Sequence, residues 1–258
     1  MFIDSHLHLT EKDYDKPIYE VVNDAMNSNV KKLIVSCCEM SDLDESLRLL
    51  KYENIFLTIG LHPSEADSYT DKDIERIEEI AKTNDRVIAI GEIGLDYYYG
   101  KENKDKQIDL FRKQLDLAQK LSLPVVIHTR DAVEDTINVL KQYNLKGVIH
   151  CFNGSIETAK EYVKMGYLLG IGGVVTFKNS KLYQVIEELA LENILLETDS
   201  PYLSPDRGKR NEPKNIPIIA EKISSIKNVD INQVGDITTS NAIELFDLKK
   251  FVWYIRIS

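Results

Sequence analysis

Short apolar runs rich in β-branched residues alternate along the chain with longer segments in which apolar residues recur every three or four positions. A short apolar run predicts a buried strand, and the longer periodicity predicts an amphipathic helix. The pairing occurs eight times, so we expect strands at residues 2–8, 31–38, 54–62, 86–94, 123–129, 147–152, 167–173 and 193–199. The helices expected to follow them cover residues 17–28, 43–51, 73–83, 106–121, 132–142, 156–165, 181–190 and 216–227.

This alternation predicts parallel strands joined by helical crossovers. Eight such units in 258 residues match the usual size of a closed (β/α)8 barrel. A doubly wound open sheet is the competing α/β architecture, but it rarely needs eight repeats. We therefore predict an α/β protein with a TIM barrel in a single domain, residues 1–246.

Residues 247–258 form a C-terminal tail of unknown role, which carries the only tryptophan of the chain, Trp253. The apolar residues of this tail are expected to dock on the barrel exterior or on a second subunit. The sequence does not distinguish these alternatives, so it leaves the oligomeric state open.

The composition is that of an ordinary globular protein, with 43% hydrophobic and 29% charged residues. No apolar stretch approaches the roughly 20 residues of a membrane-spanning helix, and the N-terminus lacks the features of a secretory signal. Three cysteines, two of them adjacent, suit a reducing cytoplasm better than a disulfide framework. We expect a cytoplasmic protein that neither binds a membrane nor requires a protein partner.

The formal charge of −10 argues against nucleic-acid binding by overall basicity. An anionic substrate would therefore have to be held by local cations. Any binding of DNA that is not specific to the site is expected to be weak and sensitive to salt.

All the histidines lie at or just beyond the C-terminal end of an apolar run, and two acidic residues share this position. These residues are His6, His8, His62, Glu92, His128, His150 and Asp199. In a parallel barrel such strand ends converge on one face, where TIM-barrel active sites lie. A single histidine on an apolar strand is most often a hydrogen-bonded core residue, but the bias of the whole set toward one face favours a functional site.

His6 and His8 are two residues apart, so on a strand both rings point the same way and can bind one ion. Neutral imidazole is a common ligand of zinc-like ions, and four histidines with two carboxylates exceed the needs of one tetrahedral structural site. The set therefore predicts a catalytic site for two metal ions. Two cations roughly 3.5–4 Å apart need a bridging group. Glu92 can supply it, and its strand contains no lysine that could take this role instead.

Two further acidic residues, Asp4 and Glu197, precede members of this set by two residues. Strand alternation places Asp4 on the same face as His6, and Glu197 on the same face as Asp199. We expect both carboxylates to support the metal ligands from behind.

Candidates for substrate contacts lie around the same strand ends. His62, in GLHP, can contact substrate or pack as a loop histidine beside Pro63. Asp96 and Arg130 lie a few residues beyond Glu92 and His128, where they can orient ligands or hold an anion. For these two, surface ion pairing is the alternative.

The loop after Asp199 contains the strongest local cluster of positive charge: Arg207, Lys209 and Arg210. These side chains can bind phosphates, or they can belong to a solvated basic loop. Tyr97–Tyr99 can stack on nucleobases or pack the loop that contains them.

Several stretches resemble those of TatD-family metal-dependent hydrolases, a branch of the amidohydrolase-type barrels. The matching stretches, in chain order, are FIDSHLHL, GLHP, GEIGLDYY, LPVVIHTRDA, GVIHCFNGS, LLETDSPYLSPDRGKRNEP and TTSNAIELF. They extend from residue 2 to about residue 246, and together they are specific.

The resemblance implies two divalent metal ions, Mg²⁺, Mn²⁺ or Zn²⁺, in a (β/α)8 barrel. It implies that His6 and His8 bind one ion and that His128 and His150 bind the other. Glu92 would bridge the ions, and Asp199 would complete the site beside the catalytic water. On this basis, Asp199 and Glu92 are the residues expected to carry catalysis.

The family is similar in activity to deoxyribonucleases that act as 3′–5′ exonucleases in DNA repair. We therefore expect a DNA substrate that is single-stranded or has a free 3′ end. A metal-dependent amide or ester hydrolase, such as a D-aminoacyl-tRNA deacylase, is the alternative, because an activated water also attacks carbonyl carbon. A noncatalytic metal-stabilised binding module is a third reading, against which the additional carboxylate of Asp199 argues.

Overall fold

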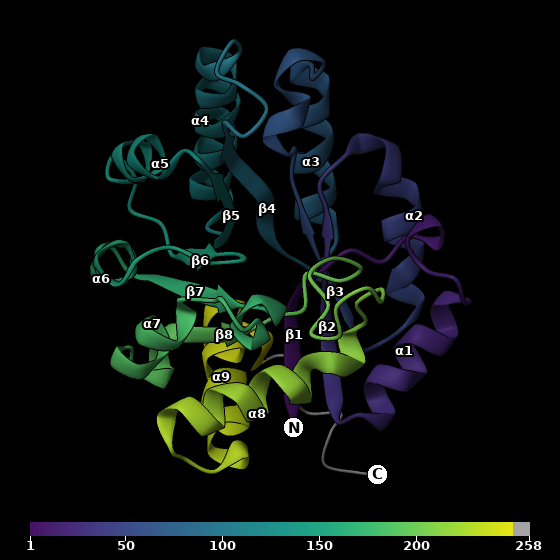
Figure 1. Ribbon diagram of the computed structural model, residues 1–258. Coiled ribbons are helices and arrows are strands. Elements are labelled where there is room, and N and C mark those ends of the chain that lie inside the picture. The colour runs from purple at the N-terminus through teal and green to yellow at the C-terminus, as the bar shows by residue number, and fades with distance from the viewer. Residues whose placement is uncertain (250–258) are drawn as a thin grey trace.

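The computed structural model describes residues 1–249 and contains a ring of strands surrounded by helices (Figure 1). The strands are β1 (Phe2–Leu7), β2 (Val30–Cys37), β3 (Ile55–Ile59), β4 (Val87–Asp96), β5 (Val125–Arg130), β6 (Gly147–Ile149), β7 (Tyr167–Ile171) and β8 (Ile194–Leu196). The α-helices are α1 (Ile18–Asn27), α2 (Leu43–Arg48), α3 (Asp71–Thr83), α4 (Lys104–Leu121), α5 (Val133–Leu140), α6 (Ile156–Lys164), α7 (Leu182–Glu188), α8 (Ile216–Lys227) and α9 (Ile231–Leu245).

The strands form one parallel sheet in the order β1 to β8, so each strand lies beside its neighbours in the sequence. The first and last strands meet through backbone hydrogen bonds just beyond β8. The Asp199 N–H donates to the His6 carbonyl at 3.0 Å, and the His8 N–H donates to the Ser200 carbonyl at 2.7 Å. The predicted (β/α)8 barrel is confirmed, and the open-sheet alternative is wrong.

Apolar side chains fill the barrel below the strand ends. Val126 and Val148 belong to this inner cluster, and each precedes a histidine of the predicted site by two residues on the same face of its strand. Phe246 and Leu248, at the end of α9 and just beyond it, pack into the same cluster. Leu248, the one apolar residue of the predicted tail within the described residues, therefore packs inside the barrel. Trp253 and the rest of the tail lie outside the described residues.

A second apolar layer lies between the sheet and the surrounding helices. In α6, for example, Ala159 and Tyr162 are buried against this layer, while the charged residues of the helix face outward. This is the amphipathic pattern from which the helices were predicted. None of the helices within residues 1–249 has the length and apolar character that would let it cross a membrane.

Candidate metal centre

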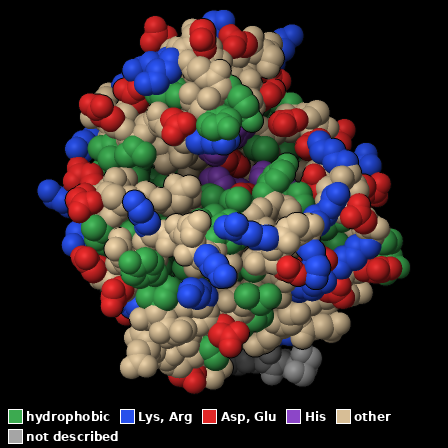
Figure 2. All heavy atoms as spheres, viewed as in Figure 1, with side chains coloured by type: hydrophobic (Ala, Val, Ile, Leu, Met, Phe, Trp, Pro, Cys, Tyr) green, Lys and Arg blue, Asp and Glu red, His purple; other side chains and the backbone are tan. Residues whose placement is uncertain are grey.

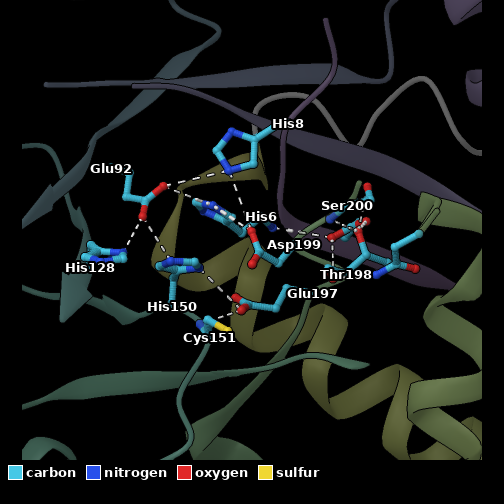
Figure 3. Close-up of polar contacts among 12 residues, drawn as sticks. His6, His8, Glu92, His128, His150, Cys151, Glu197, Thr198, Asp199 and Ser200 are labelled. Carbon is cyan, nitrogen blue, oxygen red and sulfur yellow. Dashed lines mark hydrogen bonds and ion pairs between the residues drawn. The ribbon is translucent and has the colours of Figure 1, made fainter. Parts of the chain in front are cut away.

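Glu92 lies at the centre of the converging strand ends, with an exposed fraction of 3% (Figure 3). Its Oε1 lies 2.7 Å from His128 Nδ1 and 3.0 Å from His150 Nε2. Its Oε2 lies 3.4 Å from His6 Nε2 and 4.0 Å from His8 Nε2. One carboxylate thus faces two separate pairs of imidazoles, which is the placement expected of a bridging ligand.

Asp199 closes the same cluster from the segment after β8. Its Oδ1 lies 3.6 Å from His8 Nε2 and 3.8 Å from His6 Nε2. The backbone of Asp199 is left-handed, with φ of 53°, a conformation that Asp tolerates better than most residues. This sharp bend directs the carboxylate into the cluster within three residues of the strand end.

The donor atoms of this cluster fit divalent cations. Three sets have ligand atoms within 4.8 Å of one another: His6–His8–Glu92, Glu92–His128–His150 and His6–His150–Asp199. Both ring nitrogens of His6 and Nδ1 of His150 are buried without a hydrogen-bond partner in the described part of the chain. Such unpartnered polar atoms destabilise a fold, and a bound cation would satisfy those that face the cluster.

The charges of the cluster also suit cation binding. Burial raises the pKa of Glu92, but the surrounding imidazoles outweigh it and hold that pKa well below its ordinary value. The balance is the same for Asp199, whose pKa is lowered chiefly by the hydrogen bond with His8 and by the charge of His150. Burial lowers the pKa of His6. Both carboxylates are therefore ionised at neutral pH, and His6 is a neutral ligand.

Glu197, fully buried, stands behind His150 (Figure 3). Its Oε1 accepts the Cys151 N–H at 2.5 Å and lies 3.6 Å from His150 Nδ1. Gly170 makes room for this carboxylate, because a Cβ atom at that position would lie 2.0 Å from Glu197 Oε2. The structure thus places Glu197 beside His150, and its support of a metal ligand stays a prediction.

Asp4 supports the centre in a different way from the one expected. Its carboxylate accepts the Thr198 N–H at 2.9 Å, the Thr198 hydroxyl at 2.6 Å and the His6 backbone N–H at 3.4 Å. The register of β1 against β2 shifts between Asp4 and Leu7, and this shift interrupts the strict alternation on which the expectation rested. Asp4 thus joins β1 to the segment that carries Asp199.

His62 lies just beyond β3, with its ring centre 4.6 Å from that of His128. Its Nδ1 accepts the Ser64 backbone N–H at 3.2 Å. Burial lowers the pKa of His62 to about 4, so the ring is neutral at pH 7 and carries its proton on Nε2. A ring in this state is a hydrogen-bond donor rather than a metal ligand, although His62, Asp96 and His128 also lie within coordinating distance of one another.

Asp96, at the end of β4, contacts His128 from the side opposite Glu92. Its Oδ2 lies 3.3 Å from His128 Nε2. The ring of His128 is therefore held between two carboxylates, as expected if Asp96 orients a metal ligand.

Two glutamines of α4, which the sequence analysis did not identify, position these strand ends. Gln114 accepts the Leu61 N–H at 2.7 Å and donates to the Leu61 carbonyl at 2.9 Å, immediately before His62. Gln107 forms the same pair of bonds with the backbone of Asp96, both at 2.9 Å. A signal was available, because both glutamines lie on the buried face of a helix at a spacing of seven residues.

Basic side chains, lysine or arginine, lie around a hollow at whose bottom histidines are visible (Figure 2). The guanidinium of Arg130 lies 3.5 Å from the ring centre of Tyr98, and that of Arg207 lies 4.7 Å from the ring centre of Phe177. Within residues 1–249, neither arginine forms an ion pair with a carboxylate. Lys209 and Arg210, the other cations of the basic loop, each form an ion pair with an exposed aspartate.

A (β/α)8 barrel with four imidazoles and two carboxylates gathered at the carboxyl ends of its strands has the architecture of a metal-dependent hydrolase. A family model described as TatD related DNase matches residues 3–247. This chain belongs to the TatD family of metal-dependent hydrolases.

Individual relatives match over nearly their whole length. The metal-dependent hydrolase YabD of Bacillus subtilis is 39% identical, over 95% of this chain and 99% of its own length. The human protein named deoxyribonuclease TATDN3 is 34% identical, over 95% of this chain and 94% of its own. The crystal structure of YJJV, a TatD homologue from Escherichia coli, superposes with a TM-score of 0.88 at 29% identity, covering 95% of this chain and 98% of the other.

Proposed function

We propose that this protein is a divalent-metal-dependent deoxyribonuclease that removes nucleotides from DNA in the 3′–5′ direction. The observation that carries the proposal is Glu92, whose two carboxylate oxygens face two separate pairs of imidazoles with Asp199 beside them. Such an arrangement is suited to a pair of cations that act on a phosphodiester. The family description and the name of the human relative support DNA as the substrate.

His6, His8 and Glu92 would hold one ion, and Glu92, His128 and His150 would hold the second. Asp199 would complete the site. Imidazole and carboxylate ligands suit Mg²⁺, Mn²⁺ or Zn²⁺. Divalent cations bound there supply Lewis-acid polarisation of the phosphoryl oxygens and lower the pKa of a water molecule.

Asp199 accepts a proton from the attacking water, since its carboxylate is ionised at neutral pH. The water oxygen forms a bond to phosphorus as the bond from phosphorus to the 3′ oxygen of the preceding nucleotide breaks. That oxygen takes up a proton from solvent and leaves as an alcohol, Asp199 returns its proton to solvent, and the released product is a nucleoside 5′-monophosphate. His62 Nε2–H and Arg130 donate hydrogen bonds to the phosphoryl oxygens.

The substrate we propose is DNA that is single-stranded or has a free 3′ end. Arg130 and Arg207 are unpaired cations within the described residues, and they can hold phosphates although the chain as a whole is acidic. The exposed rings of Tyr98 and Tyr99 beside Arg130 are suited to stacking on unpaired bases. We propose that the protein neither binds a membrane nor requires a protein partner. The three free thiols are consistent with a cytoplasmic location.

Asp199→Asn is the variant that tests this function. Protein loaded with Mn²⁺ is incubated in parallel with single-stranded DNA and with a D-aminoacyl-tRNA, each with a chelator control. The wild type should degrade only the DNA, and Asp199→Asn should retain its metal but lose about 10²–10⁴-fold in turnover, because an amide is not a base. Deacylation of the D-aminoacyl-tRNA without DNA cleavage would show that the protein is a deacylase and that the nuclease proposal is wrong. Metal binding without turnover of either substrate would indicate a binding module.

A further inference from the structure

A cavity of about 340 Å³ adjoins the metal centre, between the turn after His62 and the N-terminal end of α4. Its lining includes His62 and Asp96, which also contact the metal centre through His128. A group bound in this cavity would therefore lie directly beside a phosphate held at the centre. The proposed function uses His62 and Tyr99 from this lining, but it assigns no part of the substrate to the cavity itself.

The charge of the cavity is opposite to that expected of a phosphate site. Asp67, Asp96 and Glu102 line it, and no lysine or arginine is among its lining residues. Asp67 is paired with Lys106, which leaves Asp96 and Glu102 as the acidic groups without a lysine or arginine partner in the described chain. These carboxylates repel a phosphate, but they accept hydrogen bonds from a sugar hydroxyl or from the amino group of a base.

An aromatic wall completes the cavity. Tyr99 is among the lining residues, and 86% of its surface is exposed, so one ring face is available to a ligand. The guanidinium of Arg130 lies 5.9 Å from the centre of the Tyr99 ring but does not line the cavity. A phosphate beside Arg130 and a base on Tyr99 are thus neighbouring positions, as they are within one nucleotide.

We propose that this cavity holds the sugar and base of the terminal nucleotide, whose 5′-phosphate lies at the metal centre. Its volume is at the lower end of the range for small-ligand pockets, about 300–1,000 Å³, and suits one nucleoside rather than a continuing strand. A strand that continued past the cavity would bring its next phosphate against Asp96 and Glu102. The cavity therefore restricts cleavage to strand ends with a free 3′-hydroxyl. This inference rests on the proposed nuclease function and specifies which strand ends it accepts.

The test compares two 5′-labelled single-stranded oligonucleotides that differ only in a 3′-hydroxyl or a 3′-phosphate. With Mn²⁺-loaded wild-type protein, the 3′-phosphate should lower the initial rate at least about tenfold, because like charges face each other across the cavity. Glu102→Gln should reduce this discrimination, and Glu102→Lys should reduce it further. Tyr99→Ala should raise the KM for the 3′-hydroxyl substrate about tenfold while Tyr99→Phe should not, since stacking needs only the ring. Tyr183→Ala, which removes an exposed tyrosine of α7, is the matched control and should leave both rates unchanged.

Equal rates on the two oligonucleotides with the wild type would overturn the inference, as would unchanged discrimination in both Glu102 variants. Hydrolysis of bis(4-nitrophenyl) phosphate by the wild type separates this failure from failure of the proposed function. If that small diester is hydrolysed and both oligonucleotides are cleaved equally, the nuclease stands and only the cavity assignment is wrong. If neither the diester nor the oligonucleotides are cleaved, both proposals are wrong.

Discussion

The variant Glu197→Gln tests whether a carboxylate behind His150 strengthens metal binding by that histidine. His150 Nε2 lies 3.0 Å from Glu92 Oε1, so this nitrogen would bind the metal, and the ring proton would then reside on Nδ1. Nδ1 is 3.6 Å from Glu197 Oε1 and has no other partner in the described chain. Removing the charge of Glu197 therefore removes the group that favours the metal-binding tautomer of His150.

The size of the effect follows from this geometry. Loss of a partner behind a metal ligand typically lowers metal affinity about 10–100-fold, which corresponds to about 1.4–2.7 kcal/mol. The glutamine amide would also lie where Glu197 Oε2 is buried without a partner, so its N–H groups would be unsatisfied. Gly170→Ala should produce a similar loss, because its Cβ would lie 2.0 Å from that same oxygen.

Calorimetric titration of metal-free protein with Mn²⁺ or Zn²⁺ at pH 7 measures the affinity of each ion. Only the ion held by His128 and His150 should be weakened. Glu212→Gln is the matched control, since this glutamate pairs with Lys16 and Lys214 instead of a metal ligand. Two unchanged affinities in a folded Glu197→Gln protein would refute the supporting role of Glu197, and an equal loss at both ions would refute the assignment to one half of the site.

Three further predictions concern stability. A hundredfold excess of metal over Kd should stabilise the protein by about 2.7 kcal/mol per site, which raises Tm by about 5–10 °C, and a chelator should abolish the shift. Burial lowers the pKa of His62 to about 4 in the folded protein. As pH drops below about 6.5, His62 therefore becomes protonated in the unfolded chain before it does in the folded protein. The stability advantage of wild type over His62→Gln should therefore shrink by up to about 3 kcal/mol between pH 6.5 and 4, and an unchanged difference in urea titrations would contradict the burial of a neutral ring. Asp4→Ala should cost about 3 kcal/mol in the same titrations, because buried Thr198 donors lose their acceptor, and Asp4→Asn should cost less.

The barrel and the clustering of the candidate metal ligands could be predicted because both follow from local periodicity. Strand-length apolar runs separated by helical segments imply parallel strands, and parallel strands in a barrel place their carboxyl ends together. His6 and Asp199 are far apart in the chain, yet each is marked by its position at the end of an apolar run. No contact between them had to be known in advance.

The supporting contacts could not be predicted in the same way, because they depend on register and on side-chain packing. Asp4 contacts Thr198, 194 residues away, next to a register shift of β1 that strand alternation does not predict. The spacing of Gln107 and Gln114 can mark them as buried, but it does not show that they bond to the backbones of Asp96 and Leu61. Strand periodicity carries no information about either arrangement.

The two halves of the metal centre are consequently held by different means. His128 and His150 each lie between Glu92 and an outer carboxylate, Asp96 or Glu197, so side-chain charge fixes their orientation. Within residues 1–249 no outer carboxylate stands behind the ring of His6, whose Nδ1 has no partner. His6 and His8 are instead fixed by backbone hydrogen bonds across the junction of β1 with the segment after β8. Because Asp4 also spans that junction, its loss should disturb the His6–His8 half, whereas loss of Glu197 should disturb the other half.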